Sequence, residues 1–178
     1  VVAQADHLRS DYAKFQNTAL DKLVESGINR IRLEVRSGSE NTADSFGDFK
    51  AAGYPTSGTS YQAWRAKRYE TINDNNDPNV IDPTRFKFTE LDSTVDLIIN
   101  PLRDKLAAKG EQLYVNLNYV AFIGQVTSGA SYVHANAAEY AEFMLAAFQH
   151  MQQRNGWVPN AIEVILEPDN TPNPWNGT

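Results

Sequence analysis

Three apolar segments, each preceded by a stretch with helical periodicity, constrain the fold of this chain most. They cover residues 28–35, 112–119 and 161–166. Regular alternation of helical and strand patterns is typical of βαβ units, in which a helix connects two neighbouring parallel strands. The chain is therefore predicted to be an α/β protein with a parallel sheet.

Start and stop signals flank the helical stretches. A serine, threonine or asparagine followed three residues later by an acidic residue favours a helix start, and a glycine favours a helix end. These signals predict N-caps at Thr18 and Asn136 and helix ends at Gly27, Gly110 and Gly156. Pro101 lies inside the second helical stretch, where it is expected to kink or divide the helix.

Composition excludes several classes of protein. The 178 residues are 42% hydrophobic, which is enough for one sizeable core, and contain no cysteine for a disulfide or a thiolate metal site. A net charge of -6 argues against a nucleic-acid partner, which would need a basic face. No apolar stretch is long enough to span a membrane, and the first residues do not have the pattern of a secretion signal.

A long segment at about 37–88 separates the first strand candidate from the second helical stretch. It is rich in glycine, serine, asparagine and proline but also carries several aromatic residues, Trp64 among them. Long loops in compact domains are usually functional, and the aromatics favour an ordered structure. We expect an insertion on the binding face of the protein.

Polar side chains recur on one face of each predicted strand. Because side chains alternate along a strand, Arg32 and Glu34 share a face, as do Asn116 and Asn118 on the second strand. Charged and amide groups inside a parallel sheet need partners, so these faces are expected to meet in one polar space. The space is either a binding site or a purely structural network of ion pairs and amides.

The segment 161–170 directs attention to one carboxylate. There an apolar strand runs directly into Glu167, Pro168 and Asp169. A glutamate at the carboxyl end of a buried parallel strand stands where α/β barrels place catalytic acids. Glu167 is therefore the first candidate for a catalytic residue.

These residues resemble the retaining glycoside hydrolases of the clan that uses two glutamates on a (β/α)8 barrel. Residues 27–33 are similar to the second strand of that clan, with Arg32 in the place of an arginine that supports the nucleophile. Glu167 and Pro168 are similar to the end of its fourth strand, where the glutamate is the general acid/base. The resemblance implies a partial (β/α)8 barrel, with about half of the barrel in this chain and the remainder missing.

The resemblance also implies a chemistry and a location. Retaining hydrolysis uses one carboxyl group as acid and base and a second as nucleophile. Glu167 takes the first role, and the nucleophile is expected outside this chain; Glu34 is a weaker candidate for it. The implied substrate is a polysaccharide or glycoside, and the implied location is secreted or at the cell surface. No cofactor or metal is expected.

One residue departs from the pattern of the clan. The clan has asparagine immediately before the acid/base, where it contacts the sugar 2-hydroxyl, and this chain has Leu166. Asn116, Asn118 or Asn170 could replace that contact. The alternative is a non-catalytic relative that still binds carbohydrate. Two tryptophans are the remaining candidates for contact with sugar rings, Trp175 close after the acid/base and Trp64 in the long segment.

Overall fold

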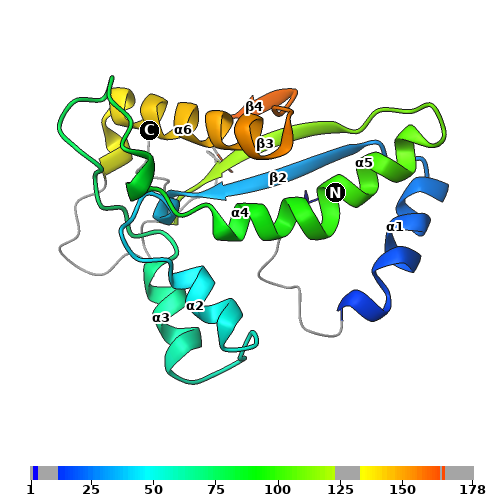
Figure 1. Ribbon diagram of the computed structural model, residues 1–178, viewed down its shortest axis with the longest axis horizontal. Helices are drawn as coiled ribbons and strands as arrows, with labels where there is room; N and C mark the ends of the chain where they lie inside the picture. Colours follow the sequence, from blue (N-terminus) through cyan, green and yellow to red (C-terminus); the bar gives the residue numbers. More distant parts are fainter. Residues whose placement is uncertain (1, 4–11, 123–132, 165, 167–178) are drawn as a thin grey trace.

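The computed structural model describes residues 2–3, 12–122, 133–164 and 166. At its centre lies a parallel sheet of four strands in the order β1-β2-β3-β4 (Figure 1). Two of the strands have seven residues each and two are shorter. They are β1 (Val2–Ala3), β2 (Arg30–Arg36), β3 (Tyr114–Val120) and β4 (Ala161–Glu163).

The prediction of a partial (β/α)8 barrel is wrong. The described residues form a small α/β sheet in which β2 and β3 pair at seven positions, while β1 and β4 pair at two and three. A barrel requires strands that continue the pairing until the sheet closes. Alternation of helix and strand in the sequence specifies βαβ units, but the extent of the sheet depends on pairing between distant residues.

Helices form at all three stretches with helical periodicity, and two further helices form within the segment 37–88. The helical segments are α1 (Gln16–Glu25), α2 (Ser45–Ala51), α3 (Thr59–Lys67), α4 (Thr89–Thr94), a π-helical turn (Val95–Ile99), α5 (Asn100–Ala107) and α6 (Ala137–Asn155). Pro101 lies in the first turn of α5, where a missing N–H costs no hydrogen bond. It therefore marks a division of the second helical stretch, as expected.

The capping signals gave one correct and one wrong helix start. Asn136 accepts a hydrogen bond from the backbone N–H of Ala138 and begins α6, and Gly156 ends α6 in the left-handed conformation with φ +73°. Thr18 lies inside α1, which begins at Gln16. A preceding turn at Tyr12–Lys14 leads directly into that helix, so α1 does not need a threonine cap.

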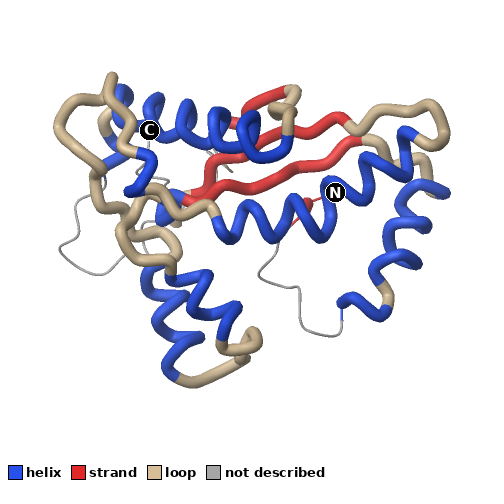
Figure 2. Tube along the Cα trace, in the orientation of Figure 1, coloured by secondary structure: helices blue, strands red, loops and turns tan. Residues whose placement is uncertain are grey.

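The main core lies on one face of the sheet. Leu33 and Val35 of β2 and Leu117 of β3 pack with the apolar stripes of α4, α5 and α6. Figure 2 shows these helices running alongside the strands. The fully buried members from these helices are Leu91, Val95, Ile99, Leu102, Leu106, Phe143 and Met151. The helices thus cover the face that carries odd-numbered residues of β2 and β3, and the even-numbered residues lie on the other face.

The segment 37–88 forms an ordered unit beside the carboxyl end of β2. Helices α2 and α3 pack together around Phe46, Phe49 and Trp64, and extend away from the sheet in Figure 1. Gly38 holds this unit close to the strand, since a Cβ there would lie 2.5 Å from the backbone oxygens of Lys67 and Arg68. Among the described residues, no helix is long and apolar enough to cross a membrane.

Candidate functional site

The face of the sheet opposite the helices carries a row of charged and amide side chains, which we call the polar face. Its members are Arg32 and Glu34 of β2, Asn116 and Asn118 of β3, and Glu163 of β4. The strand register pairs Arg32 with Asn116 and aligns Glu34, Asn118 and Glu163 across three strands. Arg32, Glu34, Asn116 and Asn118 lie on this one face. Glu167, which was expected in the same space, lies outside the described residues.

Arg32 joins two carboxylates of the polar face. Its guanidinium lies 3.7 Å from Oε1 of Glu34 and 3.5 Å from Oε1 of Glu163. Asn116 donates from Nδ2 to the other oxygen of Glu163 over 3.1 Å. Arg32, Asn116 and Glu163 line an open depression over the amino halves of β2 and β3 and over β4. Arg32 therefore fixes the positions of both acidic side chains on this face.

Asn118 is the exception in this network. Its side chain is 0% exposed, yet neither Nδ2 nor Oδ1 has a hydrogen-bond partner within the part of the chain that the structure describes. A buried amide without partners costs roughly 1–3 kcal/mol, so native proteins rarely retain one without a reason. An amide that can donate and accept at the same time suits a ligand with hydroxyl groups.

A second set of charges lies where β2 ends. Arg36 donates from Nε to Oε1 of Glu90 over 2.6 Å, and its Nη2 lies 3.1 Å from Glu34. Arg68 donates to the same oxygen of Glu90 over 3.2 Å, and Arg36 also reaches the hydroxyl of Tyr69. The network ties α3 and α4 to the strand, and it holds Glu34 between Arg32 and Arg36.

Leu166 also lies near the carboxyl end of β3. It is 5% exposed and packs with Tyr69 and with Val120, the last residue of β3. Tyr69 in turn contacts Arg36. The chain therefore passes the carboxyl ends of β2 and β3 immediately before the segment that resembles the acid/base motif. Buried among apolar groups, Leu166 takes no part in the polar network.

The predicted site residues divide into three groups. Arg32, Asn116 and Asn118 come together on the polar face. Trp64 lies apart in α3, is 4% exposed, stacks on Phe49 at 4.4 Å and lies under the guanidinium of Arg68. That packing leaves its ring no room for a sugar. The remaining three, Glu167, Asn170 and Trp175, lie outside the described residues.

A buried acidic cluster near α6 was not predicted. Nε2 of His134 lies 2.6 Å from Oε2 of Glu40, and Nδ1 shares a hydrogen bond with the hydroxyl of Tyr119 over 2.7 Å. Burial first, then the charges of Asp74, Glu139 and Glu40, raise the pKa of Glu142 to about 7. His134 and Glu40 are 94 residues apart and no local pattern links them.

No group of three or more acidic or histidine side chains in the described part of the chain has the geometry to hold a metal ion. Searches for related proteins gave no match among family models, curated proteins or solved structures. The function must therefore be inferred from the geometry and from the residues themselves. The polar face offers a guanidinium, carboxylates and amides suited to holding hydroxyl groups.

Proposed function

We propose that the protein is a glycosidase that hydrolyses O-glycosidic bonds of a polysaccharide or glycoside by a retaining mechanism with two carboxylates. Glu167 is the acid/base, which protonates the leaving oxygen and then deprotonates the attacking water. The nucleophile is a carboxylate outside these 178 residues. Both roles come from the resemblance of residues 27–33 and 167–169 to the clan of retaining glycosidases.

The observation that supports this proposal most is the enclosed amide of Asn118. It stands in register between Glu34 and Glu163, and neither of its polar atoms has a hydrogen-bond partner among the described residues. A sugar hydroxyl that displaced the groups covering this side chain would accept from Nδ2 and donate to Oδ1, which would satisfy both atoms. Asn118 therefore takes the role that the clan gives to the asparagine before its acid/base, a position that Leu166 cannot fill.

Arg32 acts by position. It holds Glu34 and Glu163 on the polar face. By the resemblance, it corresponds to the arginine that supports the nucleophile in the clan. Asn116 supports Glu163 through its hydrogen bond, and its own Oδ1 has no partner in the described ranges of the chain. Trp175 and Asn170 remain candidates for sugar contacts. We expect the protein to act at the cell surface or after secretion, where polysaccharides occur.

The experiment compares wild-type protein with Glu167→Gln on aryl β-glycosides and on polysaccharides. An acid/base matters most when the leaving group is poor, because a good leaving group departs without a proton. We expect Glu167→Gln to lose at least 100-fold in kcat/KM on alkyl glycosides and much less on dinitrophenyl glycosides. Equal losses on both substrates would contradict the assigned role.

A second candidate is a carbohydrate-binding protein without catalytic activity. The packing of Leu166 favours it, because burial against Tyr69 and Val120 keeps that residue away from any sugar hydroxyl. It predicts that oligosaccharides bind to the wild type with no turnover of any aryl glycoside. Binding by Asn118 is common to both candidates, so only hydrolysis separates them.

A further inference from the structure

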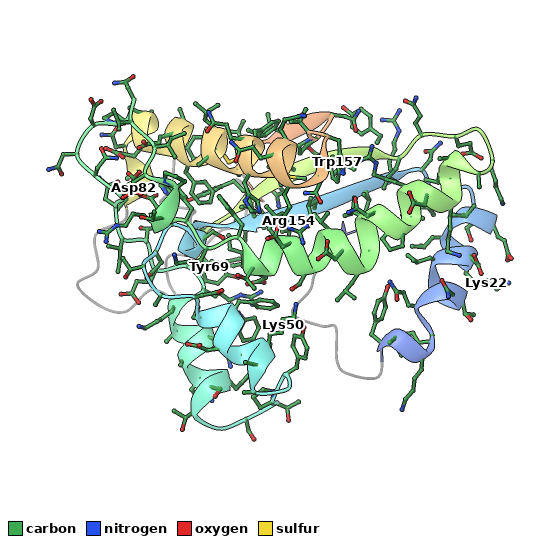
Figure 3. All side chains as sticks on the ribbon, in the orientation of Figure 1. Lys22, Lys50, Tyr69, Asp82, Arg154 and Trp157 are labelled. Carbon is green, nitrogen blue, oxygen red and sulfur yellow. The ribbon has the colours of Figure 1, made fainter. Side chains whose placement is uncertain are left out.

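A cavity lies at the amino end of β3, beside α5 and the end of α6. It has a volume of about 640 Å³ and is open on one side. Leu113 and Val115 at the amino end of β3 form its floor, and α5 and the end of α6 form its walls. We refer to it as the amino-edge cavity; Figure 3 labels Trp157 near it and Tyr69 toward the other end of the sheet.

Trp157 is held in a fixed orientation in the wall of this cavity. Its Nε1 donates to Oδ1 of Asn100 over 3.1 Å, and the guanidinium of Arg103 lies 4.3 Å from the ring centroid. Asn100 then donates to Oδ1 of Asn155, which also accepts from Arg154. Two donors on Oδ1 fix the orientation of the Asn155 amide, and its buried Nδ2 has no hydrogen-bond partner among the residues that the structure describes.

The electrostatics of the amino-edge cavity disfavour an anion. One guanidinium, Arg103, faces two carboxylates, Asp104 and Glu111. Two helices also end here, since Ala107 is the last residue of α5 and Asn155 the last of α6. Helix C-termini carry partial negative charge and repel phosphate, sulfate or carboxylate groups.

The lining also disfavours a cationic or an apolar ligand. Arg103 already places a positive charge over the indole of Trp157, and this charge would repel a second cation. Most of the other lining groups are amides or carboxylates, which an apolar ligand would desolvate without compensation. A neutral ligand with many hydroxyl groups can both donate and accept, and so it matches this mixture of groups.

We infer that the amino-edge cavity is a second carbohydrate-binding site, which takes a neutral sugar unit away from the polar face. Arg103 and Gln112 donate to sugar oxygens, Glu111 and Asp104 accept from sugar hydroxyls, and Trp157 supplies an aromatic edge for the ring. The ligand class is that of the proposed function, but the site is separate. Such a site would hold a polysaccharide to the protein independently of the catalytic step.

The test is a titration of ¹⁵N-labelled protein with cellohexaose, xylohexaose and mannohexaose, followed by NMR. We expect the indole resonance of Trp157 and the side-chain amide of Gln112 to shift with at least one of these sugars. Arg103→Ala and Glu111→Ala should each weaken the affinity at least tenfold. Lys105→Ala is the matched control, because Lys105 lies on α5, pairs with Asp21 and does not line the cavity.

Three results would overturn the inference. The first is the absence of shifts at Trp157 and Gln112 with all three neutral sugars at millimolar concentration. The second is equal affinity in Arg103→Ala and in Lys105→Ala, and the third is stronger binding of an oligogalacturonate than of the neutral sugars. Glu111 is exposed, so Glu111→Ala keeps the test valid if Arg103→Ala fails to fold.

Hydrolysis measured on the same samples separates this inference from the proposed function. Turnover of aryl glycosides without shifts at the amino-edge cavity would remove the second site and leave the glycosidase proposal intact. Shifts at the cavity without turnover of any substrate would contradict the glycosidase proposal and leave the second site intact. The two claims therefore fail independently.

Discussion

The guanidinium of Arg36 donates from Nε to Oε1 of Glu90 over 2.6 Å, which joins the last residue of β2 to the first turn of α4. Arg68 shares the same carboxylate oxygen. Because both arginines are mostly buried, Glu90 neutralises charge that water does not reach. The shape of this edge of the sheet depends on that carboxylate.

Glu90→Gln is expected to lower the free energy of unfolding by roughly 3–5 kcal/mol, because it removes the carboxylate charge that two buried guanidinium groups share. Urea denaturation monitored by circular dichroism measures the change. Glu25→Gln is the control, since it breaks the exposed pair with Lys22 and should cost less than about 1 kcal/mol. Equal losses in both variants would show that the buried network adds nothing to stability.

Asn118→Leu is expected to separate stability from function. Leucine has a similar shape and removes two unsatisfied polar atoms, so the free energy of unfolding should stay equal or rise by about 1–3 kcal/mol. If Asn118 binds a sugar hydroxyl, kcat/KM or sugar affinity should fall at least tenfold. A variant that is less stable but fully active would mean that Asn118 has an unseen structural partner and no role in binding.

Much of the polar face could be predicted from the sequence. Alternation within residues 28–35 and 112–119 was enough to place Arg32, Glu34, Asn116 and Asn118 on one face, because side-chain direction in a strand is a local property. The same reasoning put the strand ends one or two residues away from their true positions. Those ends depend on the pairing partner, such as the backbone contact between Asn29 and Tyr114.

The contacts that define the edges of the site could not be predicted. Glu90 lies 54 residues from Arg36, and Glu40 lies 94 residues from His134. Trp64 looked like an exposed residue in a polar loop, but α2 and α3 enclose it in an aromatic cluster. Such pairings arise from tertiary packing, which no local pattern encodes, and the same limit explains the wrong prediction of a barrel.

Glu142 is expected to make stability depend on pH. Its folded-state pKa of about 7 lies above the ordinary value of 4.5, so the folded protein binds the proton more tightly than the unfolded chain does. Stability should therefore fall as pH rises from about 4.5 to 7, by roughly 3 kcal/mol at most. Thermal melting across this range measures the effect.

The matched variant is Glu142→Gln, which stays neutral at every pH. It should remove most of the loss of stability between pH 5 and pH 8. If the wild type and the variant have the same pH profile, the dependence belongs to groups other than Glu142.

Leu166→Asn restores the residue that the resembled clan has before its acid/base. We expect it to lower the free energy of unfolding by roughly 2–4 kcal/mol, because it puts an amide among Tyr69, Val120 and Phe122. We expect no gain in kcat/KM. An increase in turnover would show that position 166 can reach the substrate, which would contradict the role assigned to Asn118.

The most direct test of the central claim is the stereochemistry of hydrolysis by the full-length protein. Proton NMR of the reaction in its first minutes identifies the anomer that forms before mutarotation. A retaining mechanism through a glycosyl-enzyme intermediate predicts a β-anomer from a β-glycoside. An initial α-anomer, or the absence of hydrolysis across the panel of aryl glycosides and polysaccharides, would contradict the proposal.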